Sequence, residues 1–259
     1  MDGMTGTRES QLIKAANLFV NARRTIKPFA DLPEALRPTS TAEVDYVQDL
    51  VAEAFGAVGG WKVGAGSLEA TPAAAPMPRI WIGPNGSCLA RSSHRFRGLE
   101  GEIAFLLGAD LPAHTSAYTH DEVYAAVASC HPVIEVLESG LANPVDPAVR
   151  MSKDADLQMH GGLIFGPAFA DWRSVDFSKE HVTLAVDGVV RVEAIGSNTS
   201  GNLLRLLPWL ANEGSARTGG LTAGQWITTG SWTGYTPAMA GSAVDVHFST
   251  MGMVGLRFE

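Results

Sequence analysis

The chain has 259 residues and carries 19 Lys and Arg against 27 Asp and Glu, a formal net charge of -8. That length suits one large domain, or one domain with a small helical addition, and it allows a substantial buried core. The acidic balance, with no dense cluster of basic residues, argues against a nucleic-acid partner. Near the start, Lys14 and Asn17 interrupt the apolar residues, so we expect neither a signal peptide nor a membrane span and predict a cytoplasmic protein.

Two helices are predicted in the first fifth of the chain. Apolar residues recur with a helical period over 9–24 and again over 41–55. Ser40 or Thr41 is the expected N-cap of the second helix, and Gly59 with Gly60 is expected to end it. The prolines within 26–38 predict a connecting loop between the two helices.

From residue 61 onward the pattern changes to short β-branched or aromatic segments separated by glycine, with a few helices, which is typical of an α+β fold. Residues 68–78 are rich in Ala and Pro and have no clear period. We expect them to form a mobile loop, either a lid over Lys62 or an ordinary surface loop. A short helix over 121–129 is predicted to lead into a strand over 131–138.

The chain contains only two cysteines, Cys88 and Cys130. Neither has the neighbours that a zinc site needs, apart from His131 beside the second cysteine. We therefore expect two buried free thiols.

Two carboxylates, Glu100 and Glu102, lie two residues apart in an apolar run that favours a strand. Side chains at that spacing point to the same face of a strand. Two negative charges about 4 Å apart repel by roughly 4 kcal/mol at an effective dielectric near 20. This face therefore needs a cation, a shared proton or water, and we favour a hard divalent metal ion.

A third carboxylate lies in the strand predicted over 131–138. Glu135 has apolar neighbours on both sides, whereas Glu138 is expected at the exposed end of that strand. Spacing alone leaves open which of the two points inward. Burial of Glu135 without a partner would be costly, so we expect a cation beside it.

Several segments in order resemble the fumarylacetoacetate hydrolase superfamily, in its branch of 2-keto-4-pentenoate hydratases and 2-oxo acid decarboxylases. The resemblance extends from about residue 60 to the C-terminus. The segments that carry it are GWKVGA (60–65), RGLEGEIAF (97–105), HPVIEV (131–136), KDAD (153–156), WLAN (209–212) and TTGSWTG (228–234).

The resemblance implies a mixed β-sandwich roll with a helical N-terminal region, which divides the chain into residues 1–60 and a catalytic domain over 61–259. It implies that Glu100, Glu102 and Glu135 bind Mg²⁺ or Mn²⁺. It also implies that subunits associate through the roll, so a homo-oligomer is expected.

Lys62 and Lys153 are the candidate acid–base residues, because each stands in a glycine-framed or otherwise uncharged context. A desolvated lysine beside a cation loses basicity, which moves its pKa toward neutral pH. The alternatives are a strand-end lysine that reaches solvent for Lys62 and an ion pair with Asp154 or Asp156 for Lys153. The resemblance favours the catalytic role for both lysines, with Asp156 orienting Lys153 or a water molecule.

Substrate contacts are predicted in two places. Thr229 and Ser231, with backbone amides framed by glycines, could receive a substrate carboxylate, although a tight turn explains the glycines equally well. Residues 156–159 read DLQM, followed by His160, where similar hydratases usually read DNxS, so a polar cluster has become largely apolar. His160 is a candidate replacement for a lost contact with the substrate, and a structural histidine is the alternative.

The predicted reaction follows from the chemistry of a 2-oxo acid. Such an acid, or its 2-hydroxydienoate tautomer, can chelate a hard cation through a carboxylate oxygen and the 2-oxygen, where negative charge develops on enolisation. The expected function is a metal-dependent lyase that adds water to a 2-hydroxy-2,4-dienoate to give a 4-hydroxy-2-oxo acid in aromatic catabolism. The alternatives are decarboxylation of an oxo diacid, C–C hydrolysis of an acylpyruvate, and a non-catalytic binding or assembly module.

Overall fold

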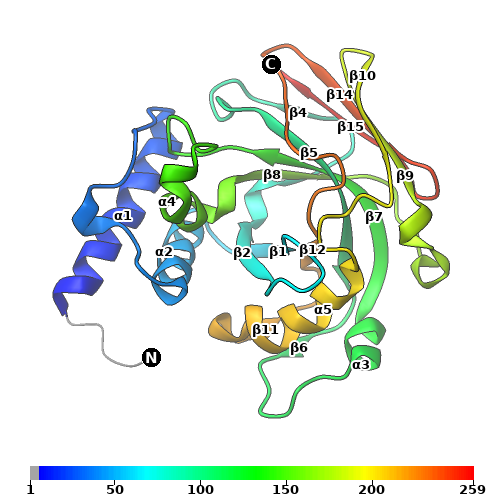
Figure 1. Ribbon diagram of the computed structural model, residues 1–259, viewed down its shortest axis with the longest axis horizontal. Coiled ribbons are helices and arrows are strands. Elements are labelled where there is room, and N and C mark those ends of the chain that lie inside the picture. Colours follow the sequence, from blue (N-terminus) through cyan, green and yellow to red (C-terminus); the bar gives the residue numbers. More distant parts are fainter. Residues whose placement is uncertain (1–5) are drawn as a thin grey trace.

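The computed structural model describes residues 6–259, which form a curved, mostly antiparallel sheet with helices at one side and a second sheet at the other (Figure 1). The predicted α+β class and the helical N-terminal region are confirmed. The division at residue 60 remains a prediction, and residues 1–5 of the region predicted over 1–60 lie outside the described part. Within residues 6–259, no helix combines the length and apolar character that crossing a bilayer requires.

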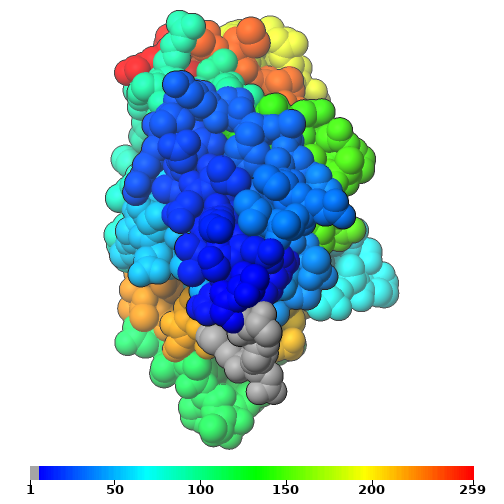
Figure 2. All heavy atoms as spheres, turned by 90° about the vertical axis from the view of Figure 1, so that its left-hand side faces the viewer, coloured from blue at the N-terminus to red at the C-terminus, as the bar shows by residue number. Residues whose placement is uncertain are grey.

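The two predicted N-terminal helices are α1 (Gly6–Thr25) and α2 (Thr41–Ala54). They lie side by side and cover one face of the molecule (Figure 2). Their contact is apolar, with Leu12 and Phe19 of α1 in the same buried cluster as Val47 of α2. This packing, more than helix propensity, stabilises both helices.

Short-range signals explain where α2 begins and ends. The Ser40 side chain accepts the backbone N–H of Glu43, as predicted for the N-cap. The prediction for the end is wrong, because α2 ends at Ala54 and Gly56 takes a φ of 110°. Gly60 instead lies in strand β1 (Val58–Gly64), where a Cβ atom would stand 2.3 Å from the carbonyl oxygen of Trp226. Close approach of two strands therefore requires this glycine.

An ion pair joins the two N-terminal helices and makes stability depend on pH. Arg8 donates from Nε to Glu43 at 2.8 Å, and this hydrogen bond is the main reason that the pKa of Glu43 falls from 4.5 to about 2. A carboxyl group with a lowered pKa in the folded state stabilises above its unfolded pKa and loses that effect as pH falls through the folded pKa.

We expect Glu43→Gln to destabilise the protein near pH 7 by about 1 kcal/mol, and this difference from wild type should vanish between about pH 5 and pH 2. Urea unfolding at a series of pH values measures it. Glu53→Gln, on the same helix, is the control. An equal deficit of Glu43→Gln at both ends of that pH range would contradict the prediction.

Within residues 6–259, the larger sheet has eight strands. Within it, β1 pairs in parallel with β12 and β3 pairs in parallel with β8, and the other pairs are antiparallel. The strand order is β2 (Ala73–Pro78), β1, β12 (Trp226–Thr228), β5 (Gly98–Leu107), β7 (Val127–Leu137), β8 (His160–Phe165) and β3 (Ile82–Pro84), with β13 (Thr236–Pro237) also paired to β5.

Two segment predictions need correction here. Residues 73–78, predicted as part of a mobile loop, form the edge strand β2, where Pro76 and Pro78 are tolerated because an edge strand leaves one row of backbone groups unpaired. The helix predicted over 121–129 is α3 (His120–Ala125), and β7 begins earlier than predicted.

The prediction that Glu138 is exposed is also wrong. Glu138 is buried just beyond β7, and its carboxylate accepts the backbone N–H of Phe96 at 2.7 Å.

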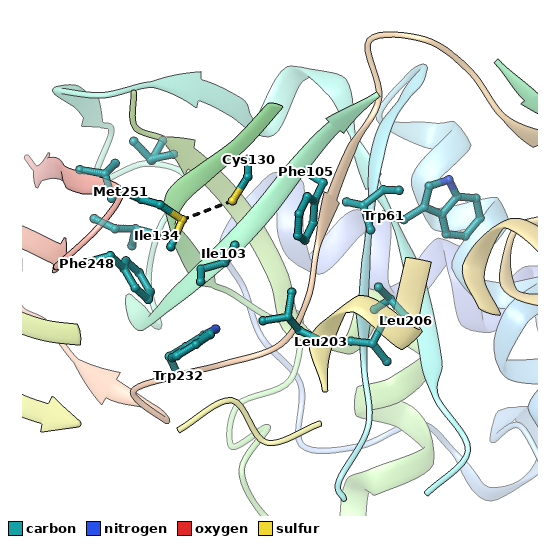
Figure 3. Close-up of a cluster of buried hydrophobic side chains, with 14 of the residues drawn as sticks. Trp61, Ile103, Phe105, Cys130, Ile134, Leu203, Leu206, Trp232, Phe248 and Met251 are labelled. Carbon is teal, nitrogen blue, oxygen red and sulfur yellow. Dashed lines mark hydrogen bonds between the residues drawn. The ribbon is translucent and has the colours of Figure 1, made fainter. Parts of the chain in front are cut away.

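The second sheet, of five strands in the described part of the chain, packs against the first across an apolar core. In Figure 3, Ile103 and Ile134 of the larger sheet lie near Phe248 of the smaller one and near Met251, in the turn that follows Phe248. The strand order is β10 (Val189–Ile195), β9 (His181–Val186), β14 (Ala243–Phe248), β15 (Gly252–Phe258) and β4 (Ser87–Leu89). Outside the two sheets lie the short helices α4 (Arg150–Ala155) and α5 (Leu206–Trp209) and the paired short strands β6 (Leu111–Pro112) and β11 (Gly220–Leu221).

The two cysteines differ in their surroundings. Cys130 is buried between the sheets, with its Sγ 3.2 Å from the sulfur of Met251 (Figure 3). Cys88 is exposed on the edge strand β4, so the prediction of a buried thiol is right for Cys130 and wrong for Cys88.

Candidate metal centre and its surroundings

Three glutamates converge on one face of the larger sheet. Glu100 of β5 lies directly opposite Glu135 of β7 in the antiparallel register, and Glu102 follows two residues along β5. One carboxylate oxygen from each lies within 4.8 Å of the other two. Glu102 and Glu135 are buried and Glu100 is half-buried. The pairing of two strands with a period of two residues thus brings together the three acids that the sequence predicted as metal ligands.

Lys62, on β1, reaches into this group of acids. Its Nζ lies 2.9 Å from Glu135 Oε1 and donates to the backbone carbonyl of Gln158 at 3.1 Å. Burial lowers the pKa of Lys62, but the charges of Glu135, Glu100 and Glu102 outweigh burial and raise it. This direction is opposite to the loss of basicity predicted from the sequence, because three carboxylates surround the ammonium group.

The carboxylates respond differently to their shared site. Burial raises the pKa of Glu102 well above its usual value, and the charges of Glu135 and Glu100 add to the effect. Burial also raises the pKa of Glu100. Burial acts in the same direction on Glu135, but Lys62 and His160 outweigh it and lower the pKa of that group. The site therefore disfavours three ionised carboxylates with only one ammonium group beside them.

The donor set fits a divalent cation. If all three glutamates are ionised, Lys62 balances one of their three negative charges. A divalent cation would neutralise the other two. Within residues 6–259, no group hydrogen-bonds the buried Oε2 of Glu135, whereas Oε1 has two donors. An anionic oxygen left without a partner in the interior is costly unless a cation binds it. Hard ions such as Mg²⁺ and Mn²⁺ prefer oxygen ligands of this type.

His160, the first residue of β8, is fully buried. Its Nδ1 lies 3.0 Å from Glu135 Oε1. Burial lowers the pKa of His160, with Glu135 opposing that shift. The structure thus places His160 against a predicted metal ligand, and the predicted contact with substrate stays a prediction.

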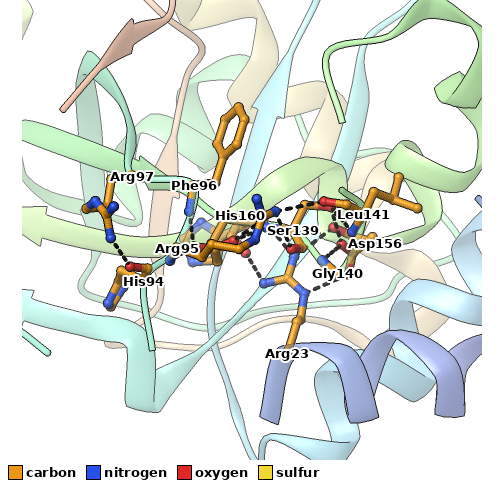
Figure 4. Close-up of polar contacts among 11 residues, drawn as sticks. Arg23, His94, Arg95, Phe96, Arg97, Ser139, Gly140, Leu141, Asp156 and His160 are labelled. Carbon is orange, nitrogen blue, oxygen red and sulfur yellow. Dashed lines mark hydrogen bonds and ion pairs between the residues drawn. The ribbon is translucent and has the colours of Figure 1, made fainter. Parts of the chain in front are cut away.

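The predicted link between Asp156 and Lys153 is wrong. The carboxylate of Asp156 is fully buried and accepts Arg23 Nε of α1 at 2.6 Å, and the Ser139 hydroxyl at 2.7 Å (Figure 4). A guanidinium group from the N-terminal helix therefore neutralises this acid in the interior. Lys153, on α4, lies instead 3.8 Å from the carboxylate of Asp154, as the alternative interpretation allowed.

Thr229 and Ser231, both predicted to bind the substrate carboxylate, differ in their hydrogen-bond partners. Thr229 is buried and its hydroxyl donates to the Ile103 carbonyl at 2.7 Å, which leaves it a structural role. Ser231 faces the site, where burial raises the pKa of Glu100 and a hydrogen bond from the Ser231 side chain opposes that rise. Thr228, which the sequence interpretation did not select, donates its hydroxyl to Glu102.

Two adjoining cavities open onto the acids, and both are lined by Lys62, Glu100 and Gln158. We name them the polar lobe and the apolar lobe. The polar lobe, of about 310 Å³, is completed by Val63, Gly64, Ala65, Gly66, Glu102, Thr199, Gly230, Ser231 and Gly234. The apolar lobe, of about 300 Å³, is completed by Leu137, Val145, Lys153, Asp154, Met159 and Tyr235.

A strained turn separates α4 from β8 beside these lobes. Leu157, Gln158 and Met159 have φ values of 54°, 50° and 67°, a left-handed stretch that non-glycine residues rarely adopt. Lys62 holds the turn through the Gln158 carbonyl, and the Met159 carbonyl accepts the backbone N–H of Glu138 at 2.8 Å. Strain of this kind is typical of functional sites. The turn coincides with the segment that departs from the hydratase pattern.

Comparison with known proteins gives one sequence relative and several similar structures. No protein-family model matches the chain. The chain is 26% identical over 165 residues to a 2-oxo-hept-4-ene-1,7-dioate hydratase of Escherichia coli, and the match covers 62% of this chain and 61% of that relative. The chain therefore aligns with somewhat less than two thirds of the relative's length.

Similarity to solved structures extends over nearly the whole chain. A 4-oxalocrotonate decarboxylase from Pseudomonas putida G7, complexed with magnesium and adipate, is 26% identical with a TM-score of 0.84, covering 99% of this chain and 100% of that chain. The same enzyme complexed with calcium and acetate gives 24% identity and a TM-score of 0.83 over the same shares of the two chains. A fumarylacetoacetate hydrolase family protein from Yersinia pestis CO92 shares the fold over 77% of this chain and 91% of that one, with 16% identity and a TM-score of 0.57.

Proposed function

We propose that this chain is a metal-dependent hydratase. It is similar in sequence to a 2-oxo-hept-4-ene-1,7-dioate hydratase, and its fold is similar to that of a fumarylacetoacetate hydrolase family protein. It would add water to a 2-hydroxy-2,4-dienoate to give a 4-hydroxy-2-oxo acid. The observation that carries the proposal is the convergence of Glu100, Glu102 and Glu135, of which Glu135 has a buried oxygen that no group within residues 6–259 hydrogen-bonds. A Mg²⁺ or Mn²⁺ ion held there would stabilise negative charge on the carboxylate and the 2-oxygen of an oxo acid.

Lys62 is the proposed general acid. It lies where the polar and apolar lobes meet, so its Nζ faces the middle of a substrate that spans both lobes. The surrounding carboxylates raise its pKa, which favours the protonated form that can deliver a proton to a dienol carbon. Ser231 and the glycine-framed amides of the polar lobe would bind the carboxylate beside the 2-oxygen.

The apolar lobe would accept the far end of the substrate. The side chains of Leu137, Val145, Met159 and Tyr235 give it an apolar part, and Lys153 supplies a cation. The carboxylate of Asp154 stands 3.8 Å from Lys153 Nζ, a distance too long for a strong hydrogen-bonded pair. We therefore propose Lys153 as the partner of a second substrate carboxylate, a binding role that differs from the acid–base role predicted for it and that favours a dioic substrate.

Ultraviolet spectroscopy tests the reaction. Purified protein is mixed with 2-hydroxypenta-2,4-dienoate or 2-hydroxyhepta-2,4-diene-1,7-dioate in the presence of Mg²⁺, Mn²⁺ or a chelator. Loss of dienol absorbance that needs the metal and releases no carbon dioxide supports hydration. A rate that the chelator leaves unchanged would overturn the metal mechanism.

A second candidate function is decarboxylation of an oxo diacid on the same site. The similarity to a decarboxylase over the whole chain favours it, and so does a lobe with a lysine for a second carboxylate. Carbon dioxide release from 4-oxalocrotonate separates it from hydration, and pyruvate release from an acylpyruvate would indicate C–C hydrolysis. Inactivity toward every 2-oxo acid despite bound metal would favour a non-catalytic module.

Lys153→Met should raise KM for the dioic substrate at least 10-fold, because the lost ion pair to a substrate carboxylate is worth about 1.4 kcal/mol or more. KM for the five-carbon monoacid should stay within about 2-fold. Lys179→Met is the control, because Lys179 is exposed and pairs with Asp176 outside both lobes. Equal changes in KM for both substrates would contradict the assignment.

We also propose, as the sequence predicted, a cytoplasmic homo-oligomer that takes part in aromatic catabolism. Sedimentation of the purified protein tests the oligomeric state, and cell fractionation tests the location. A single sedimenting species at the mass of one chain, 27.4 kDa, would contradict the oligomer.

A further inference from the structure

We infer that His160 is a positioning residue, which fixes the Glu135 carboxylate so that one of its oxygens remains free for the cation. This inference rests on the metal site of the proposed function and concerns a residue whose predicted role was contact with substrate. It places His160 behind Glu135, in the protein interior, and not among the residues that contact the substrate.

The first observation is how the two oxygens of Glu135 are used. Oε1 receives Lys62 at 2.9 Å and His160 Nδ1 at 3.0 Å. Oε2 is buried and, in the part of the chain that the structure describes, has no hydrogen-bond partner. Two donors on one oxygen prevent the carboxylate from turning that oxygen toward the cation. The geometry therefore selects Oε2 as the ligand atom.

The second observation is how the imidazole itself is held. His160 pairs across β7 and β8 with Leu137, so it is a diagonal neighbour of Glu135 on the same face of the sheet. Its carbonyl accepts Arg23 at 2.9 Å, and its ring lies 6.0 Å from that of Trp81. The left-handed turn over 157–159 directly precedes it. A ring held by backbone and neighbours in this way orients its hydrogen-bond partner at little entropic cost.

The third observation separates this role from substrate binding. As formed by residues 6–259, the linings of the polar and apolar lobes do not include His160, which is fully buried. A carboxylate only accepts hydrogen bonds, so Nδ1 of His160 must be the donor. His160 therefore contacts Glu135 from the protein interior, and not from the cavities that would hold the substrate.

The choice of replacement distinguishes the two ring nitrogens. Asparagine places an amide nitrogen near the position of Nδ1, whereas glutamine places one near Nε2. We expect His160→Ala to weaken Mn²⁺ binding about 10- to 100-fold, the usual cost of losing a group that orients a metal ligand. His160→Asn should restore affinity to within about 3-fold of wild type, and His160→Gln should not.

Calorimetric titration with Mn²⁺ alone, supported by electron paramagnetic resonance of the unbound ion, gives these affinities without any substrate. Unchanged affinity in His160→Ala, or recovery by glutamine and not by asparagine, would overturn the inference. The Asn and Gln variants decide the matter even if the Ala variant does not fold. Wild-type protein that binds Mn²⁺ but hydrates no dienoate would overturn the proposed function and leave the role of His160 standing.

Discussion

Glu102→Gln is expected to have opposite effects on metal binding and on the stability of the metal-free protein. Affinity for Mn²⁺ should fall by more than about 100-fold, beyond the range typical of groups that only orient a ligand, and the proposed hydratase activity should fall with it. The metal-free variant should be more stable than metal-free wild type at pH 8. The reason is that burial and two neighbouring carboxylates raise the pKa of Glu102.

The sign follows from proton linkage. A carboxyl group whose folded pKa lies above its unfolded value binds more protons in the folded state, so the protein loses stability as pH rises above the unfolded pKa. Glutamine removes that loss because it carries no charge at any pH. The Thr228 hydroxyl, which donates to Glu102, can also donate to the amide oxygen of glutamine.

Thermal unfolding in chelator and in excess Mn²⁺ measures both effects. Wild type should gain stability with Mn²⁺ because the ion binds only the folded state, and Glu102→Gln should gain little. Glu193→Gln, which removes an exposed acid paired with His181, is the control and should respond like wild type. If Mn²⁺ raised the Tm of Glu102→Gln as much as that of wild type, Glu102 could not be a ligand.

The convergence of Glu100, Glu102 and Glu135 could be anticipated because it depends on local periodicity. Glu100 and Glu102 share a face by strand geometry alone, and an apolar strand around Glu135 makes a buried carboxylate there improbable without a cation. The N-cap at Ser40 was predictable for the same reason, since capping depends on residues three apart.

The errors concern contacts between residues distant in the sequence. Asp156 was assigned to its near neighbour Lys153, but its partner Arg23 stands 133 residues away. One signal was present, because Arg23 falls on the same helical face as the buried residues Leu12 and Phe19. A charged residue on such an apolar face indicates a buried partner, but the pattern does not say which acid it is.

The contact of His160 with Glu135 was hidden for a different reason. It depends on which strands are neighbours and in which register, and β8 follows β7 only after the helix α4 and a left-handed turn. No periodicity within 156–160 predicts three consecutive non-glycine residues with positive φ. Tertiary contacts determine that conformation, so the sequence left His160 with two open interpretations.

Arg23 and Asp156 form the buried ion pair whose loss should most destabilise the fold. Their side chains are 4% and 0% exposed. Besides Asp156 Oδ1, the guanidinium group donates to the backbone carbonyls of His160 at 2.9 Å, Glu138 at 3.0 Å and Asp156 at 3.0 Å (Figure 4). One side chain of α1 thus fixes the start of β8 and the end of β7, which links the N-terminal helices to the proposed metal site.

We expect Arg23→Met to lower the free energy of unfolding by about 3–5 kcal/mol, because it leaves a buried carboxylate without its counter-charge. Asp156→Asn should cost a similar amount, since it leaves the guanidinium group uncompensated. The double variant should lose less than the sum of the two single losses, because the second change removes the charge that the first left unpaired. Urea unfolding of the four proteins gives this coupling.

Arg24→Met is the matched control, because Arg24 is the next residue of α1, lies over the Phe55 ring and is exposed, so its loss should cost no more than about 0.5 kcal/mol. Arg23→Met should also weaken Mn²⁺ binding, since Arg23 holds the backbone of His160 and His160 holds Glu135. If Arg23→Met were as stable as Arg24→Met, the ion pair would not anchor the helices. If it lost stability but bound Mn²⁺ like wild type, the helices would be anchored independently of the metal site.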